Sequence, residues 1–156
     1  MTDSTLAAPA APDTAVPADV AELAAQLPVV QRGARWFWWI AGLSAVNVVI
    51  VLSNGQTRFP VGLCYTEVAE ALFESELPLQ VAFDALVVAG FVLAGRGATR
   101  GSARAFVVGM VAYVLDALIF LAAGDWVPVM FHALAMVYIV QGYRALRAAK
   151  QAAGFA

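Results

Sequence analysis

Long apolar runs dominate the pattern of hydrophobic and polar positions along this chain. Four of them follow one another, each closed by glycine, proline or charged residues, and they cover about residues 35–53, 79–94, 103–123 and 126–143. Each run is close to the ~20 residues that a helix needs to cross the hydrocarbon core of a bilayer. The pattern therefore predicts an all-α polytopic membrane protein, a four-transmembrane-helix bundle made of two helical hairpins.

The connection between the first two runs, residues 55–78, has a helical pattern of its own. From Tyr65 to Leu77, apolar residues recur at helical spacing on one face, with glutamates on another. We expect an amphipathic helix that lies on the outer membrane surface and ends at the following proline. Its acidic face is either simply solvated or forms a cation site and an outer lid at Glu67 and Glu70.

The two ends of the chain differ from its apolar body. The first 28 residues hold nine alanines, four of the seven prolines and four acids, with no Lys or Arg. Such a segment buries too little surface to order itself. We therefore expect residues 1–30 to be a flexible cytoplasmic tail, with a short helix over 19–27 as an alternative within it. Residues 31–150 form the expected four-helix transmembrane domain, and residues 151–156 a C-terminal tail.

Composition narrows the class of protein. The chain is 62% hydrophobic and only 13% charged, and its mean hydropathy is +0.79, far from the usual soluble balance of ~25% charged residues. The formal net charge is -2, and no basic stretch carries interleaved aromatic residues, so a nucleic-acid partner is not expected. The lone Cys64 excludes an intrachain disulfide. The lipid bilayer is the partner that this composition predicts.

The distribution of basic residues predicts an orientation. Eight of the nine Lys and Arg residues flank the apolar runs on one side, and only Arg58 lies on the other. By the positive-inside rule, both termini of this multi-pass protein are cytoplasmic. The eight residues are Arg32, Arg35, Arg96, Arg100, Arg104, Arg144, Arg147 and Lys150.

Four polar side chains fall at one depth within the apolar runs, one in each run. Each lies six or seven residues inside the outer end of its run, which corresponds to ~9–11 Å below the outer boundary at ~1.5 Å per residue. They are Asn47, Asp84, Asp116 and His132. Asp116 and His132 lie at matching distances from the turn between the last two runs, so we expect these two side chains to face each other.

Two interpretations of this polar cluster stay open. Buried polar groups can hydrogen-bond one another across helices and hold them together, at ~1 kcal/mol or less per contact. Intramembrane ionisable residues also mark ion pathways, so the alternative is a proton or cation site open to the outer face. A single histidine among oxygen donors suits a proton or a hard cation better than zinc or copper. We therefore expect neither a transition metal nor a cofactor.

No motif in the sequence indicates an enzyme. The G-x-S-x-G elbow, the H-E-x-x-H zinc motif and a glycine-rich dinucleotide fingerprint are all absent. One arrangement to weigh is a membrane hydrolase built on Asp116, His132 and a serine, with Ser44 or Ser53 as the nucleophile. An isolated nucleophile is a signal of low specificity, so we expect no catalytic residues.

Three segments of the apolar body form a pattern that extends over about residues 36–147. They are Trp39-Ile40-Ala41-Gly42-Leu43-Ser44 with Asn47, Val61-Gly62-Leu63 with Thr66, and Leu115-Asp116-Ala117-Leu118-Ile119-Phe120-Leu121 with Asp125-Trp126 and Phe131-His132. Together they resemble a group of small four-helix bacterial membrane proteins. The resemblance implies a four-helix fold in a bacterial inner membrane and implies no activity. Members of this group often have Gln and Asp where this chain has Glu67 and Glu70, which weakens any role carried over to those two residues.

The sequence thus predicts a non-enzymatic integral membrane protein, an accessory or interaction subunit in which the polar cluster sets helix packing. The alternative is a small proton- or cation-coupled carrier that uses Asp84, Asp116 and His132. Such a carrier would act as an oligomer, because four short helices enclose little space. Besides lipid, the expected partner is another protein or further copies of this chain.

Overall fold

The computed structural model is all-helical over the residues that the structure describes, which are 18–53, 63–65, 68 and 76–154. The all-α prediction is confirmed. The helices in chain order are α1 (Ala18–Ala25), α2 (Pro28–Leu52), α4 (Leu77–Thr99), α5 (Ala103–Ala123) and α6 (Trp126–Ala152). The surface helix expected after Tyr65, with Glu67 and Glu70, lies almost entirely outside the described residues.

The first long helix begins before the apolar run from which it was predicted. α2 begins at Pro28 rather than near Arg35, because the first helical position needs no backbone N–H donor and proline fits there. The same proline separates α2 from the short helix α1, which lies in the segment where the sequence left a helix over 19–27 open. At ~1.5 Å per residue, the 25 residues of α2 extend for ~37 Å.

The hairpin of α5 and α6 has well-defined ends. Ser102 caps α5, because its hydroxyl accepts a hydrogen bond from the N–H of Ala105 at 3.2 Å. Gly124 ends α5 in the left-handed conformation, with φ of 77°, which costs glycine little. The bounds of α5 agree with the predicted run. α4 and α6 both continue beyond their predicted ends at 94 and 143. In α6 the added residues are mainly alanine, arginine and lysine, which favour a helix.

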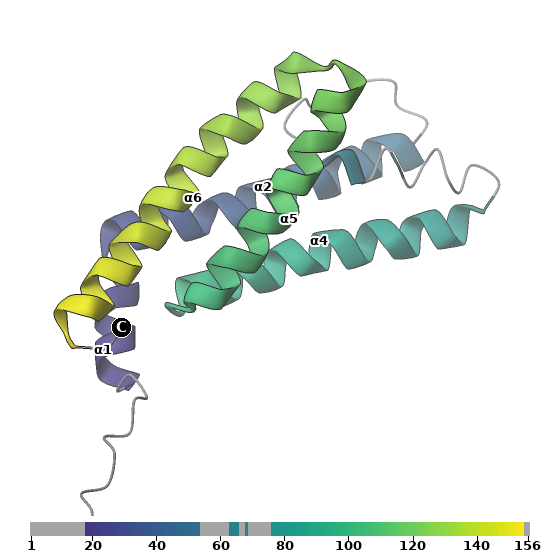
Figure 1. The fold of residues 1–156 in the computed structure, drawn as a ribbon. Coiled ribbons are helices and arrows are strands. Elements are labelled where there is room, and N and C mark those ends of the chain that lie inside the picture. Colours follow the sequence, from purple (N-terminus) through teal and green to yellow (C-terminus); the bar gives the residue numbers. More distant parts are fainter. Residues whose placement is uncertain (1–17, 54–62, 66–67, 69–75, 155–156) are drawn as a thin grey trace, which may run out of the picture.

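The four long helices form a closed ring in which each packs mainly against two of the others. α2 packs against α4 and α6, and α5 packs against the same two helices (Figure 1). At one end of the bundle, Gln31 Nε2 at the start of α2 donates to the carbonyl oxygen of Thr99 at 3.0 Å. There too, Lys150 Nζ near the end of α6 donates to the carbonyl oxygen of Gly101 at 2.8 Å. The segments that carry most of the basic residues therefore gather at this end.

The backbones of α2 and α6 come very close at one crossing. A Cβ atom added at Gly33 would lie 2.8 Å from the carbonyl oxygen of Tyr138 and 2.9 Å from the Cα of Gly142. Two backbones come this near only where both side chains are hydrogen. Next to this crossing, Phe37 and Phe106 pack with ring centroids 5.9 Å apart and form the centre of the apolar core.

Most of the outer surface of the bundle is apolar. Within the described residues, three helices are long and apolar enough to cross a membrane, namely α4, α5 and α6. Only 22% to 28% of their most apolar windows is buried inside the protein. Many large apolar side chains on these helices are exposed, among them Leu86, Leu93 and Val108, which is unusual for a soluble monomer. These helices are those of a membrane protein.

Candidate functional site

Asp116 and His132 are in direct contact across the α5–α6 hairpin. His132 Nε2 lies 2.8 Å from Asp116 Oδ2, and the two side chains are 2% and 0% exposed. Each residue stands about two helical turns from the Gly124 turn, one before it and one after it, so the antiparallel pairing of the helices brings them to the same level. The structure thus brings together the two residues that the sequence places at matching distances.

The surroundings of the His132 ring determine where its protons lie. Nδ1 is 2.8 Å from the carbonyl oxygen of Pro128, and a carbonyl oxygen can only accept, so Nδ1 carries a proton and donates it. Nε2 faces the carboxylate of Asp116, so one further proton lies between Nε2 and Oδ2. The pair is then an imidazolium and a carboxylate, or a neutral imidazole and a carboxylic acid, with the same number of protons in both.

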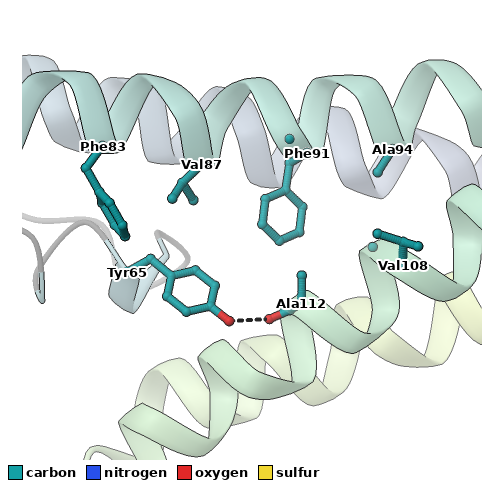
Figure 2. Close-up of a pocket in the computed structure, with 9 residues that line it drawn as sticks. Tyr65, Phe83, Val87, Phe91, Ala94, Val108 and Ala112 are labelled. Atoms are coloured by element: carbon teal, nitrogen blue, oxygen red, sulfur yellow. Dashed lines mark hydrogen bonds between the residues drawn. The ribbon is translucent and has the colours of Figure 1, made fainter.

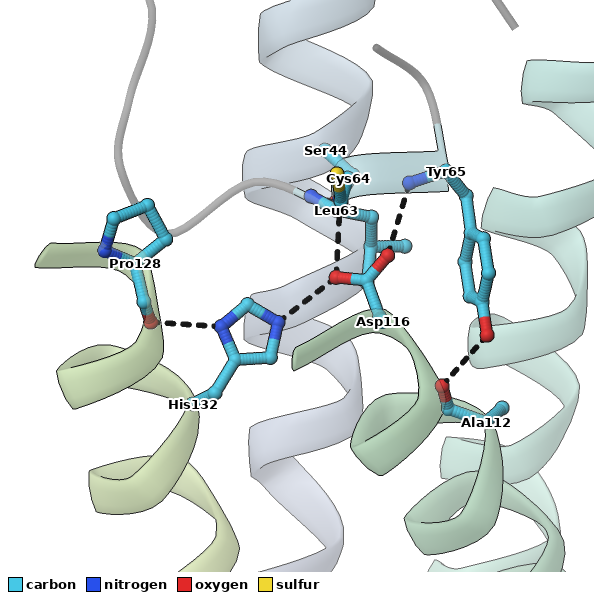
Figure 3. Close-up of polar contacts among 8 residues, drawn as sticks. All are labelled: Ser44, Leu63, Cys64, Tyr65, Ala112, Asp116, Pro128 and His132. Carbon is cyan, nitrogen blue, oxygen red and sulfur yellow. Dashed lines mark hydrogen bonds and ion pairs between the residues drawn. The ribbon is translucent and has the colours of Figure 1, made fainter. Parts of the chain in front are cut away.

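The same carboxylate also binds the connector between α2 and α4. The N–H of Cys64 donates to Asp116 Oδ2 at 3.0 Å, and the N–H of Tyr65 donates to Oδ1 at 2.9 Å (Figure 3). Immediately before them, the N–H of Leu63 donates to the hydroxyl of Ser44 on α2 at 3.1 Å. Cys64 and Tyr65 are helical, and the first N–H groups of a helical turn have no acceptor within it. Side chains of α5 and α2 supply these acceptors.

Aromatic rings shield the pair from solvent. Tyr113 stacks on His132 with ring centroids 4.1 Å apart and an angle of 20° between the rings, and Phe120 lies against the imidazole at 5.5 Å. In such a low-dielectric setting, hydrogen bonds to a charged group are stronger than in water. Tyr113 is fully buried, and its hydroxyl makes no hydrogen bond among the described residues.

Tyr65 closes one end of an apolar pocket between α4 and α5. The pocket has a volume of about 320 Å³, and Phe83, Val87 and Phe91 line its α4 side (Figure 2). The Tyr65 hydroxyl donates to the carbonyl oxygen of Ala112 on α5 at 3.0 Å. Burial, and then the nearby Asp116 carboxylate, raise the pKa of Tyr65 above its usual value, so its phenol keeps the proton that it donates.

The two other polar residues that the sequence places at this depth also point inward. Asn47 on α2 and Asp84 on α4 are both buried. The contacts described above join Asp116 with His132. In the part of the chain that the structure describes, no group of three or more His, Cys, Asp or Glu residues is arranged to hold a metal ion.

The hydrolase arrangement weighed from the sequence does not match the geometry. A serine nucleophile needs a histidine nitrogen to accept its proton, but both nitrogens of His132 face other acceptors, Pro128 and Asp116. The Ser44 hydroxyl instead accepts from the N–H of Leu63. The sequence could not reveal this role of Ser44, because the connector has no pattern that brings residues 63–65 into the bundle.

Comparison with known proteins gives no relative from which to transfer a function. No family model matches this chain, and no curated protein or solved structure matches it significantly. Function has to be inferred from the buried pair, the connector that it binds and the surfaces around them.

Proposed function

We propose that this chain is a non-enzymatic integral membrane protein with four transmembrane helices, whose Asp116–His132 pair clamps the connector between the first two. The fourth span in this proposal is α2. Its ~37 Å length exceeds the ~30 Å hydrocarbon core, and it packs against α4 and α6, which are long and apolar enough to cross a membrane. Its outward face carries the exposed side chains of Trp39, Val46 and Val49, which suit lipid contact.

The proposed location is a bacterial inner membrane with both termini in the cytoplasm. The gathering of basic segments at one end of the bundle supports this orientation, because the positive-inside rule assigns that end to the cytoplasm. The resemblance to small four-helix bacterial membrane proteins points to the same membrane. Reporter fusions at the C-terminus and within the α2–α4 connector test it. A reporter that works only in the cytoplasm should be active at the C-terminus, and a reporter that works only outside the cytoplasm should be active in the connector. The opposite pattern would contradict the orientation.

The main support for the proposed function is the set of hydrogen bonds made by the Asp116 carboxylate. It is hydrogen-bonded to His132 on α6 and accepts from the N–H groups of Cys64 and Tyr65, so one side chain connects α5, α6 and the connector. A carrier would need this carboxylate to exchange its donors for a substrate ion. The arrangement instead suits a rigid accessory or interaction subunit that presents fixed helix faces to a partner in the membrane.

Photo-crosslinking in native membranes tests the interaction role. A photoreactive residue at Leu86 on α4 or Val108 on α5, both exposed on the outer surface, should give a protein adduct of defined mass, either another protein or a second copy. The buried Tyr113 position is the control and should give none. If every exposed position of α4 and α5 yields only lipid adducts, the subunit proposal fails.

One observation favours the carrier as a second candidate. A single proton lies between His132 Nε2 and Asp116 Oδ2, and that oxygen also binds the Cys64 N–H. Loss or gain of this proton would change the strength of the hydrogen bond between Asp116 and the connector, as a proton-coupled gate requires. Proteoliposomes with a pH-sensitive dye inside distinguish the candidates: a carrier transports protons and Asp116→Asn abolishes the transport, whereas an accessory subunit shows no flux above empty liposomes.

A further inference from the structure

A groove with two different ends lies between α2 and α6. Its volume is about 370 Å³. Arg32 and Arg35 contribute to its lining near one end, and the rest of the lining is apolar or aromatic. The groove is lined by residues of α2 and α6, namely Arg32, Arg35, Trp36, Trp39, Leu43, Phe131 and Leu134.

The charged end offers two cations to one ligand. Arg32 and Arg35 are three positions apart on α2 and so point from the same face of the helix. Both are exposed, and neither forms an ion pair with any of the residues that the structure describes. The guanidinium group is planar and weakly hydrated, which makes it well suited to a phosphate group. The site carries positive charge that the described part of the protein does not neutralise.

The remainder of the groove fits a hydrocarbon chain. Leu43 is eleven residues beyond Arg32, so the apolar wall continues for ~16 Å along the helix axis. Trp36 stacks on Tyr138 of α6 with ring centroids 5.3 Å apart, which fixes one wall. Trp39 is 64% exposed, at the level where tryptophan commonly marks the boundary between headgroups and hydrocarbon.

We propose that this groove binds an anionic phospholipid, with the phosphate between Arg32 and Arg35 and one acyl chain along Leu43, Phe131 and Leu134. This inference rests on the proposed placement of α2 and α6 in the membrane. Charge at one end of an otherwise apolar groove is complementary to a lipid, which has its charge at one end only. Basic pockets between transmembrane helices on the cytoplasmic side bind anionic headgroups in this way.

Native mass spectrometry of the full chain in detergent, with equal amounts of phosphatidylglycerol and phosphatidylcholine, tests the site. Each arginine should contribute about fivefold preference for the anionic lipid. The double variant Arg32→Gln/Arg35→Gln should therefore bind the two lipids nearly equally. Arg147→Gln is the matched control, because Arg147 is an exposed residue of α6 that does not line the groove, and it should keep the wild-type preference.

A second variant tests the apolar part of the groove. Leu134→Trp fills it while leaving both arginines in place, and should reduce the amount of bound phosphatidylglycerol. Leu86→Trp, on the exposed face of α4, should not. Equal binding of the two lipids by the wild type, or a loss of preference in Arg147→Gln as large as in the double variant, would overturn the site alone. Recovery of the wild-type chain from the soluble fraction of cells would overturn the membrane placement and the site with it.

Discussion

His132 Nε2 and Asp116 Oδ2 form a hydrogen bond of 2.8 Å, and the rest of the site is arranged around that contact. The opposite nitrogen of His132 donates to the Pro128 carbonyl, which fixes the ring in one orientation. Asp116 uses its second oxygen for the connector. Removing either partner therefore affects three segments of the chain at once.

Replacing His132 should destabilise the fold strongly. His132→Phe keeps a ring against Tyr113 but removes both ring nitrogens, and the Asp116 side chain is left buried with only the connector N–H groups. Breaking one side of a buried charged pair costs about 3–5 kcal/mol. Thermal unfolding in detergent should show a large fall in the midpoint temperature. Met130→Leu, on the exposed face of α6, is the control, and equal midpoints for the two variants would refute the prediction.

The crossing of α2 and α6 gives a second prediction. Gly33→Ala should destabilise the protein by about 1–3 kcal/mol, because the added methyl group meets the backbone of α6, which cannot move aside as a side chain can. Gly42 is also on α2, but a Cβ atom added there meets nothing within 4 Å. Gly42→Ala should therefore be neutral or stabilising by up to about 1 kcal/mol. Thermal unfolding in detergent is the measurement. If both variants are less stable than the wild type, or both more stable, this packing is contradicted.

Two serines of the same segment should behave differently. Ser44→Ala removes the acceptor of the Leu63 N–H inside the bundle and should cost about 1 kcal/mol. Ser53 donates to the Val49 carbonyl on an exposed helix end, so Ser53→Ala should change the stability little. Thermal unfolding of the two variants is the measurement. A larger effect at Ser53 would mean that residues 63–65 are not held as described.

Two tyrosines near the pair form another matched comparison. Tyr65→Phe removes a hydrogen bond to Ala112 and should lower the free energy of unfolding by about 0.5–1.5 kcal/mol. Tyr113→Phe keeps the stacking on His132 and removes a buried hydroxyl that has no partner among the described residues. It should be neutral or stabilising. If Tyr113→Phe is the more damaging change, its hydroxyl has a role that these contacts do not include.

Part of this arrangement could be predicted from the sequence. The apolar run and the turn at Gly124 predicted the bounds of α5. Equal spacing from that turn indicated that Asp116 and His132 face each other. The contact of Asp116 with Cys64 could not be predicted, because it is made by backbone N–H groups, which leave no residue-type signal. The Gly33 crossing was missed for a related reason, since small residues are too common in this chain to single out one pair.

The central claim is that Asp116 holds the connector inside the bundle, and Cys64 reports on it directly. Cys64 is the only cysteine of the chain, it is buried, and its N–H binds Asp116. A membrane-impermeant maleimide applied to the outer face of native membranes should label wild-type Cys64 slowly. Full labelling after denaturation in detergent provides the reference.

Asp116→Asn should accelerate that labelling at least about tenfold, the factor that corresponds to 1.4 kcal/mol of lost stabilisation, because one amide oxygen cannot replace both carboxylate oxygens. Asp125→Asn, in the exposed hairpin turn, is the control and should label like the wild type. If Asp116→Asn also labels at the wild-type rate, Asp116 does not clamp the connector, and the structural role proposed for the pair is wrong.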